Sequence, residues 1–308
     1  MENLQSFFPP TRFGSIKAVT PATAGLSGAG VYAVTADAGE FFIRLHRADL
    51  GGFSAAVAAQ RLAAEQGIAP EVIHVDEAAG AVVSAKVDGV NIRKALAQPS
   101  VRPVALRSLA ECLARLHAIP ASGLPTFDPM DRQSYWDEQS RRKGFPAWAA
   151  SLGTFVSAGT EILARDGRRV FSHNDLAPGN LLWDSSQVWI VDWDSAGLEH
   201  PYSDLATFSN FSGLTDDDAI SLLELQEQSE ISSEQRSTFK SLRNLSRVLY
   251  GASYLNMIPH LAEIDFMSRD TAPTLPECYI RLDRGELDPK TAAGQAALGA
   301  AFLRQAQL

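Results

Sequence analysis

The sequence predicts an α+β protein in which a β-rich segment, residues 1–88, precedes a longer and mostly helical segment, residues 89–308. Between residues 14 and 46, short apolar runs rich in β-branched and aromatic residues are separated by glycine turns. A further strand-like run, residues 80–87, ends at the Asp88-Gly89 turn. Beyond this turn the apolar residues follow helical spacing. We therefore expect two lobes with a boundary near residue 88.

Composition limits the classes of function. The chain has 308 residues, of which 45% are hydrophobic and 20% charged, so it can bury a sizeable core. A net charge of −9 and a pI near 5.2 argue against a nucleic-acid partner and favour a small cationic one. The two cysteines have no metal-ligand spacing and suit a reducing cytosol. With neither a signal-peptide pattern nor a membrane-length apolar run, we expect a cytoplasmic protein without a membrane partner.

Several elements are predicted in the first segment. They are strands at 31–35 and 40–45, a helix at 53–66, and strands at 68–73 and 80–87. The glycine-rich turn at 25–30 would let backbone N–H groups approach an anion, although an ordinary hairpin turn is equally compatible with it. Its Gly28-Ala29-Gly30 triplet matches a dinucleotide fingerprint only weakly, because a hairpin follows where a helix is needed.

One cation stands out on the predicted strand at 40–45. Arg44 lies among apolar residues, and in a nucleotide site it would pair with the α- and β-phosphates. An edge-strand arginine in solvent is the alternative. The backbone between Ser84 and Lys86, just before the lobe boundary, is where an adenine edge would form hydrogen bonds.

The second segment is predicted to be helical. Helices are expected within 91–118, at 152–165, from about 203 to 211, and at 216–228, 233–258 and 289–306, with a loop at 120–133. His117 is expected to end a helix rather than to bind a ligand. Asp204 either caps its helix or supports the loop that carries the candidate site.

The stretch from Val170 to Asp194 carries the chemistry. It holds His173, Asp175, Asn180, Asp192 and Asp194 around a predicted hairpin whose strands are residues 181–183 and 188–191. Such a hairpin can hold carboxylates and an amide around one point. Phosphoryl transfer needs a carboxylate to orient the attacking hydroxyl and oxygen ligands for Mg²⁺.

The His-x-Asp-x-x-x-x-Asn pattern alone would arise by chance in about one or two chains per hundred of this length. The Asp-Trp-Asp triplet that follows on the next strand makes chance improbable. With these motifs at 172–180 and 190–197, and Ser-Asp-Leu-Ala at 203–206, the chain resembles the aminoglycoside phosphotransferase and choline kinase superfamily over about residues 20–260. The resemblance implies a protein-kinase-like bilobal fold, with a β-rich N-lobe and a larger helical C-lobe.

The resemblance also implies roles for individual residues. Asp175 would be the catalytic base, and Asn180 with Asp192 would hold Mg²⁺ on the ATP phosphates. Asp194 would support the metal site or contact the substrate, and His173 would brace the loop. The nucleotide would be bound by residues of both predicted segments: Ser27 and Gly28 at its phosphates, Arg44 at the α- and β-phosphates, Ser84 and the Lys86 backbone at the adenine edge, and Leu182 as the adenine floor.

The chain departs from the family pattern at two places. The glutamate that many relatives carry on the N-lobe helix would fall near Ala55 or Ala56, and Glu65 comes late on that helix. Asp194-Ser195 stands where Glu-Tyr is common, which removes an aromatic residue suited to a quaternary ammonium. The resemblance implies a kinase for a choline- or ethanolamine-like acceptor. An aminoglycoside O-phosphotransferase and a nucleotide-binding pseudo-kinase are the alternatives. A His/Asp metallohydrolase would need further histidines.

Overall fold

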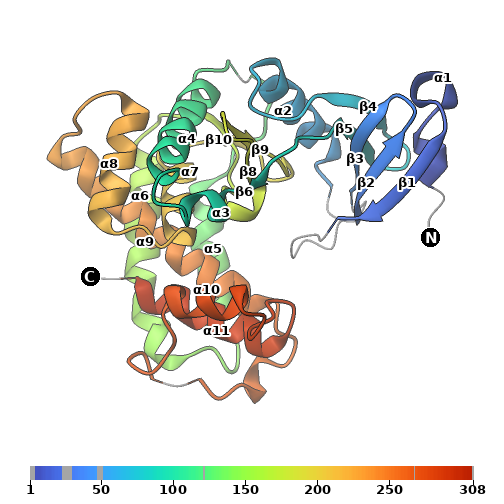
Figure 1. Cartoon of the computed structure of the whole chain (residues 1–308). Helices are drawn as coiled ribbons and strands as arrows, with labels where there is room; N and C mark the ends of the chain where they lie inside the picture. Colours follow the sequence, from blue (N-terminus) through green and yellow to red (C-terminus); the bar gives the residue numbers. More distant parts are fainter. Residues whose placement is uncertain (1–3, 23–29, 47–50, 121, 267, 307–308) are drawn as a thin grey trace. The chain divides into compact units, whose positions relative to one another are not determined.

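The computed structural model describes residues 4–22, 30–46, 51–120, 122–266 and 268–306. The chain forms two compact units, Met1–Pro125 with Val170–Leu198 and Thr126–Arg169 with Glu199–Leu308. The first unit holds a five-stranded sheet, and the second is built mainly of helices (Figure 1). The predicted α+β fold class is therefore confirmed. The lobe boundary near residue 88 stays a prediction.

The sheet of the first unit is antiparallel, with strand order β1-β2-β3-β5-β4. Its strands are β1 (Ile16–Pro21), β2 (Gly30–Ala36), β3 (Gly39–Leu45), β4 (Val72–Asp76) and β5 (Ala81–Ala85). The prediction that a strand starts at residue 68 is wrong, because β4 begins at Val72. The Ile68 N–H donates to Ala63 O at 3.0 Å, and the Ile68 carbonyl accepts from Ile190 N at 2.9 Å. This backbone is therefore bonded to a helix end and to the hairpin, not to a neighbouring strand of the sheet.

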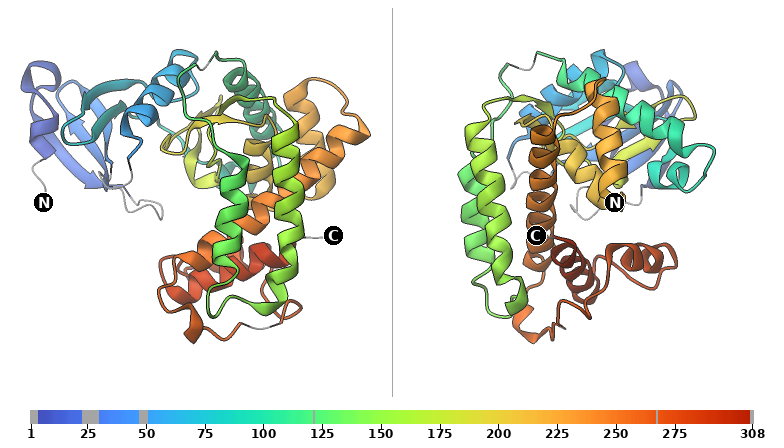
Figure 2. Two further views of the ribbon diagram at one scale, coloured as in Figure 1. Left: turned by 180° about the vertical axis from the view of Figure 1, so that it is seen from behind. Right: turned by 90° about the vertical axis from the view of Figure 1, so that its left-hand side faces the viewer.

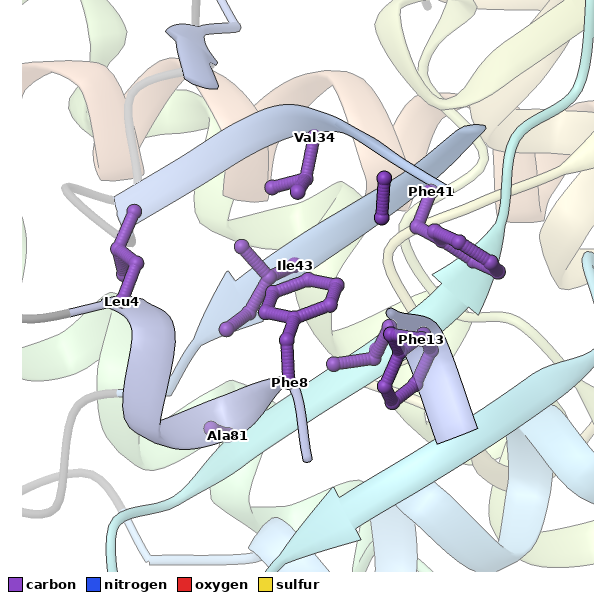
Figure 3. Close-up of a cluster of buried hydrophobic side chains, with 9 residues drawn as sticks. Leu4, Phe8, Phe13, Val34, Phe41, Ile43 and Ala81 are labelled. Atoms are coloured by element: carbon purple, nitrogen blue, oxygen red, sulfur yellow. The ribbon is translucent and has the colours of Figure 1, made fainter. Parts of the chain in front are cut away.

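The two faces of the sheet have different tasks, because side chains alternate along a strand. On β3, Phe41 and Ile43 point into a buried cluster, whereas Phe42 and Arg44 line a cavity on the other face. The cluster is closed by the N-terminal elements η1 (Leu4–Phe7) and α1 (Pro10–Phe13) (Figure 3). Its buried members are Leu4, Phe8, Phe13, Val34, Ala36, Phe41, Ile43, Ala81 and Val83. Packing on the cluster side therefore holds β3 in place, and this positions Phe42 and Arg44 on the cavity side.

The remainder of the first unit carries the predicted hairpin, which is confirmed: β8 (Leu181–Trp183) pairs with β9 (Val188–Ile190). The hairpin continues to β6 (Val90–Asn91), and β7 (Val170–Ser172) pairs with β10 (Gly197–Glu199). Besides η1 and α1, the described residues of this unit form the helices α2 (Phe53–Glu65), α3 (Ile92–Leu96), α4 (Arg102–His117) and the 3₁₀ turn η4 (Pro178–Asn180). His117 ends α4, as predicted.

The turn of the hairpin is held by one carboxylate. Asp184 Oδ1 accepts hydrogen bonds from Ser186 N and Gln187 N, both at 2.8 Å, and Asp184 Oδ2 accepts from Trp189 Nε1 at 2.7 Å. Burial acts to raise the pKa of Asp184, but these hydrogen bonds outweigh it and lower that pKa to about 2. The charged side chain therefore stabilises the turn.

We expect Asp184→Ala to lower the free energy of unfolding by about 1–2 kcal/mol, because it removes these accepted hydrogen bonds. Since the folded pKa lies below that of the unfolded chain, the contribution is complete above about pH 4 and is lost as the pH falls towards 2. Urea denaturation at pH 7 and at pH 3 measures both effects. Asp184→Asn keeps one acceptor oxygen and should fall between the two proteins; equal stability of all three would contradict the assignment.

The second unit is helical and is organised around its longest helix, α9 (Ser233–Asn256), which begins with a Ser232–Gln235 capping box. α9 packs against α6, α7 and α11, and α5 lies beside α6 (Figure 2). Gly251 and Gly299 let α9 and α11 approach closely: a Cβ at Gly251 would lie 2.6 Å from Leu303 Cγ. The helices of this unit are α5 (Pro129–Gln139), η3 (Ala147–Leu152), α6 (Gly153–Arg165), α7 (Ser203–Phe211), α8 (Asp216–Glu227), α9, η5 (Leu261–Glu263), α10 (Leu275–Asp283) and α11 (Ala292–Gln305).

Two helices of this unit differ from the sequence prediction. The loop expected to reach residue 133 ends earlier, because Asp128 caps α5 and Pro129 occupies its first turn. α10 was not predicted, although Thr274 and Glu277 form a capping box at its start. None of the helices in the described ranges combines the length and the apolar character needed to cross a bilayer.

Both cysteines are buried and reduced. Cys112 lies in α4, and Cys278 lies in α10. Burial raises the pKa of Cys112 to about 12 and that of Cys278 to about 11. A thiolate is therefore disfavoured at both positions.

Candidate functional site

The loop between β7 and β8 holds the proposed catalytic residue. The Asp175 backbone carbonyl accepts from Ala177 N at 2.8 Å, and Asn180 N donates to Ala177 O at 2.9 Å, so the loop folds into a tight turn before η4. This turn brings the two predicted side chains together. Asn180 Nδ2 donates to the Asp175 backbone carbonyl at 2.8 Å and to Asp175 Oδ2 at 3.1 Å. The five-residue spacing thus produces a carboxylate that is oriented by an amide.

His173 links this loop to the segment that directly follows β9. Its side chain is fully buried, and Nε2 lies 3.1 Å from the Val191 carbonyl oxygen. Because a carbonyl only accepts, Nε2 carries the hydrogen in this contact. The ring also packs edge-on against Trp193, with the ring centroids 4.9 Å apart. This geometry agrees with a bracing role, which stays a prediction.

The backbone at the predicted metal ligand is unusual. Asp192 has φ = +70°, in the left-handed region that few non-glycine residues adopt. Asn174, next to the proposed catalytic residue, has φ = +64° and donates from Nδ2 to Ser195 O at 3.1 Å. Such conformations cost free energy and persist where the surrounding structure holds them, often at functional sites.

A cavity of about 260 Å³ lies within the first unit. Its walls are apolar on two sides: Val31, Phe42 and Val82 come from the sheet, and Leu182 comes from the hairpin. Its polar lining includes the charged pair Arg44 and Asp192, which are in contact, and the amide of Asn180. A flat apolar ring and a charged tail would therefore each find a matching surface.

Arg44 is partnered in this structure, with 20% of its side chain exposed. Its Nη1 donates to Asp194 Oδ1 at 2.6 Å, and its Nη2 donates to Asp194 Oδ2. Nη2 also lies 2.8 Å from Asp192 Oδ1. The partner that the sequence left open is thus the acidic pair of the Asp-Trp-Asp motif, and Arg44 is not an edge arginine in solvent.

The electrostatics at Asp192 follow from these contacts. Burial raises the pKa of Asp192, and Arg44 opposes this by favouring the carboxylate. The negative charges of Asp194 and Asp175 raise that pKa further. A site with this concentration of negative charge favours cations.

Other predicted site residues lie as follows. Ser84 lines the cavity with Ala85 and Val87, whereas the Lys86 ammonium pairs with Glu40 and Asp88 outside it. The Lys86 N–H already donates to Glu40 O at 3.2 Å. Ser27 and Gly28 lie outside the described residues. Asp204 is buried in the first turn of α7, whose N-cap position is occupied by Tyr202, so Asp204 is not the cap.

Two residues at the site were missed by sequence reasoning. Gln60 lines the cavity from α2, and its Nε2 donates to Ser84 Oγ at 2.9 Å and to Pro70 O at 3.0 Å. The sequence feature that could have indicated Gln60 is that it is the one amide side chain in the alanine-rich helix α2. His46 lies two residues beyond Arg44, and its Nδ1 is 3.3 Å from Asp194 Oδ2. His46 directly follows β3, and if the alternation of that strand is continued by one residue His46 falls on the face of Arg44, which was the available signal.

The residues present fit a magnesium ion. Asn180 and Asp192 supply an amide and a carboxylate, and Asn180 directs its nitrogen at Asp175, which places its oxygen on the other side of the amide. Mg²⁺ prefers oxygen ligands, commonly one or two from the protein together with substrate phosphates. Among the residues that the structure describes, no group of three or more His, Cys, Asp or Glu side chains is arranged as a metal cage.

Comparison with known proteins identifies the family. The model of the phosphotransferase enzyme family (APH) matches residues 18–236. Among curated protein sequences, none matches. The fold is similar to that of a choline/ethanolamine kinase family protein from Mesorhizobium loti, with 20% identity, a TM-score of 0.68, and coverage of 93% of this chain and 92% of that one.

Two further solved structures show the same fold. Choline kinase LicA from Streptococcus pneumoniae is 16% identical, with a TM-score of 0.63 and coverage of 98% of this chain and 96% of that one. Aminoglycoside phosphotransferase APH(3'')-Id from Streptomyces rimosus, in complex with ADP and streptomycin, is 20% identical, with a TM-score of 0.54 and coverage of 80% and 99%. The protein-kinase-like fold implied by the sequence is confirmed by these likenesses. The family match covers most of the chain, and the chain therefore belongs to the phosphotransferase enzyme family.

Proposed function

We propose that this enzyme transfers the γ-phosphoryl group of ATP to a hydroxyl of a small cationic molecule, with a choline- or ethanolamine-like acceptor as the leading class. The observation that carries the proposal is the shared cavity of Arg44, Asn180 and Asp192, with Asp175 bonded to Asn180. This arrangement combines a phosphate-binding cation, oxygen ligands and an oriented carboxylate.

The cavity suits a nucleotide. The adenine would lie between Leu182 and the apolar side chains of the sheet, with its polar edge towards the backbone of residues 84–87. Arg44 would bind the α- and β-phosphates. Similar structures contain nucleotides: LicA has been solved with AMP, and the Streptomyces rimosus enzyme with ADP.

Asp175 would act as the base. As the acceptor oxygen attacks phosphorus, its proton moves to the Asp175 carboxylate while the bond from the γ-phosphorus to the β–γ bridging oxygen breaks and ADP leaves. The amide of Asn180 holds this carboxylate in place. Asn180 and Asp192 would also hold Mg²⁺, which supplies neutralisation of charge on the phosphates. An ionised carboxylate can accept a proton or bind a metal ion, and an amide offers a neutral oxygen ligand. Both groups therefore suit these tasks at neutral pH.

Two features support a cationic acceptor. The net charge of the chain is −9. Within the helical unit, a cavity of about 520 Å³ is lined by aromatic and acidic side chains, among them Phe127, Tyr135, Tyr250, Asp128 and Asp131. Arg132 also lines this cavity, but its positive charge is paired with Glu199. Aromatic faces and carboxylates attract organic cations. Trp193 and Tyr202, which are also aromatic, are 2% and 0% exposed and belong to the core.

An aminoglycoside is the second candidate acceptor, because its several amino groups would be attracted by the same net negative charge and because an aminoglycoside phosphotransferase is among the structures with a similar fold. The pseudo-kinase alternative rested on the missing helix glutamate. The pairing of Arg44 with Asp192 and Asp194 weakens that argument.

A screen for ADP release tests the proposal. Purified enzyme with ATP and Mg²⁺ is incubated with choline, ethanolamine, thiamine, sugars and aminoglycosides, and Asp175→Asn protein serves as the control for contaminating kinases. We expect release above the control with choline or ethanolamine. Release only with aminoglycosides would select the second candidate. Nucleotide binding without turnover of any acceptor would favour the pseudo-kinase.

A further inference from the structure

The helix beside the cavity gives Arg44 no carboxylate. α2 carries its only acidic side chain, Glu65, at its last residue. The α2 side chain that reaches the cavity is Gln60, and its amide is bonded to Ser84 and to the Pro70 carbonyl. A bidentate pair with a carboxylate fixes the orientation of a guanidinium, and in this chain the carboxylate that pairs with Arg44 comes from outside α2.

Asp194 supplies it. Its carboxylate accepts both ends of the Arg44 fork, from Nη1 to Oδ1 at 2.6 Å and from Nη2 to Oδ2. A guanidinium has five N–H groups in one plane. The fork with Asp194 uses two of them, and Nη2 also lies in ion-pair contact with Asp192, 2.8 Å from Oδ1. Within the described part of the chain the other N–H groups of Arg44 make no hydrogen bond, and they remain for phosphate oxygens while the fork stays intact.

His46 connects this carboxylate to the start of α2. Its side chain is 7% exposed, and Nδ1 lies 3.3 Å from Asp194 Oδ2. On the other side of the ring, Nε2 lies 2.7 Å from the Gly51 carbonyl oxygen, next to the helix N-cap Gly52. Both contacts are hydrogen bonds when both ring nitrogens carry a hydrogen, because the carbonyl and the carboxylate only accept. Phe53, the first residue of α2, packs on the ring with centroids 5.5 Å apart. Strand, Asp-Trp-Asp motif and helix thus meet at one imidazole.

We propose that Asp194 and His46 are positioning residues: Asp194 fixes the Arg44 guanidinium for the nucleotide phosphates, and His46 fixes Asp194 against the start of α2. The inference rests on the proposed nucleotide-binding function of the cavity. It assigns the second acid of the Asp-Trp-Asp motif to the cation, in place of the metal or the acceptor.

The direction in which Asp194→Asn changes ADP affinity distinguishes a positioning role of Asp194 from a purely electrostatic one. Asp194→Asn removes a negative charge near the proposed phosphate site, which by itself would tighten ADP binding. If Asp194 instead orients Arg44, the same change releases the guanidinium and weakens ADP binding, by about tenfold for the loss of a charge-assisted pair. Calorimetric titration with ADP, with and without Mg²⁺, measures the direction.

The full set of proteins is Asp194→Asn, His46→Ala, His46→Gln and the double variant Asp194→Asn/His46→Ala. His74→Ala is the matched control, because His74 is a half-buried histidine of β4 whose ring packs on Phe13. We expect His46→Ala to weaken ADP binding about three- to fivefold, His46→Gln to recover part of this, and the control to match the parent. The double variant should be no worse than Asp194→Asn alone.

Steady-state kinetics extend the test: KM for ATP should rise in Asp194→Asn and in His46→Ala, while kcat and the acceptor KM change less than about twofold. Tighter ADP binding in Asp194→Asn, a loss seen only with Mg²⁺, or additive losses in the double variant would overturn the inference. Thermal melts identify a variant that fails to fold, and His46→Gln then replaces His46→Ala. ADP binding needs no acceptor, so a failed acceptor screen and a failed positioning test are distinguishable.

Discussion

Asp175→Asn is expected to lower kcat by about 10²–10⁴-fold, the range for loss of a positioned general base. Asparagine has nearly the shape of aspartate but cannot take up the hydroxyl proton. The interaction with Asn180 Nδ2 can be kept by the new side-chain oxygen, so the loop between β7 and β8 should remain folded. ADP affinity is expected to change less than about threefold, because Arg44 and the apolar walls of the cavity are untouched.

Initial rates with the accepted substrate and calorimetric ADP binding measure the two quantities. Asp217→Asn is the matched control, since Asp217 lies in the exposed first turn of α8. An Asp175→Asn enzyme with the kcat of the control would remove Asp175 from the chemistry. A parallel loss of ADP affinity and of thermal stability would instead indicate a structural role.

Asp192→Asn is expected to lower the Mg²⁺-supported rate by more than about 100-fold, because a metal that neutralises phosphate charge contributes several kcal/mol to the transition state. The asparagine keeps an oxygen ligand but loses the charge. Asp192 has φ = +70°, and asparagine tolerates this region better than most residues. The variant should therefore fold as the parent does.

A Mg²⁺ titration of the rate, together with thermal melts, measures these effects. Asp192→Ala provides an informative comparison, because alanine in the left-handed region is expected to cost a further ~1–2 kcal/mol in unfolding free energy. Asp194→Asn should keep the Mg²⁺ dependence of the parent. Equal Mg²⁺ dependence in the parent and in Asp192→Asn would contradict the metal assignment.

Local sequence patterns were enough to predict the fold and part of the candidate site. The hairpin of β8 and β9 was predictable because two short apolar runs and a polar turn specify it within Leu181–Ile190. The contact of Asp175 with Asn180 was equally local, since five residues separate them. Helices α6, α8, α9 and α11 were predicted from their own local sequence, whereas α10 was not. In each case the information lies within one element or one turn.

The partner of Arg44 could not be found in this way. Arg44 and Asp194 are 150 positions apart, and their pairing depends on how the sheet and the hairpin enclose the cavity. The family pattern places a glutamate on α2, so the partner of Arg44 was expected on that helix. In the structure the partner is Asp194, which follows the hairpin. The start of β4 was similarly mispredicted, because the Ile68 carbonyl accepts a long-range backbone hydrogen bond from Ile190. Such contacts depend on tertiary packing, and the periodicity of residues along one helix or strand gives no information about it.

The buried thiols of Cys112 and Cys278 have a practical consequence. Maleimides and iodoacetamides react with thiolates, and neither native sulfur presents one at neutral pH. A single cysteine engineered at an exposed position should therefore be labelled selectively by a fluorophore or a spin label without prior removal of the natural pair. The native sequence already serves as the unreactive background that site-directed spectroscopy requires.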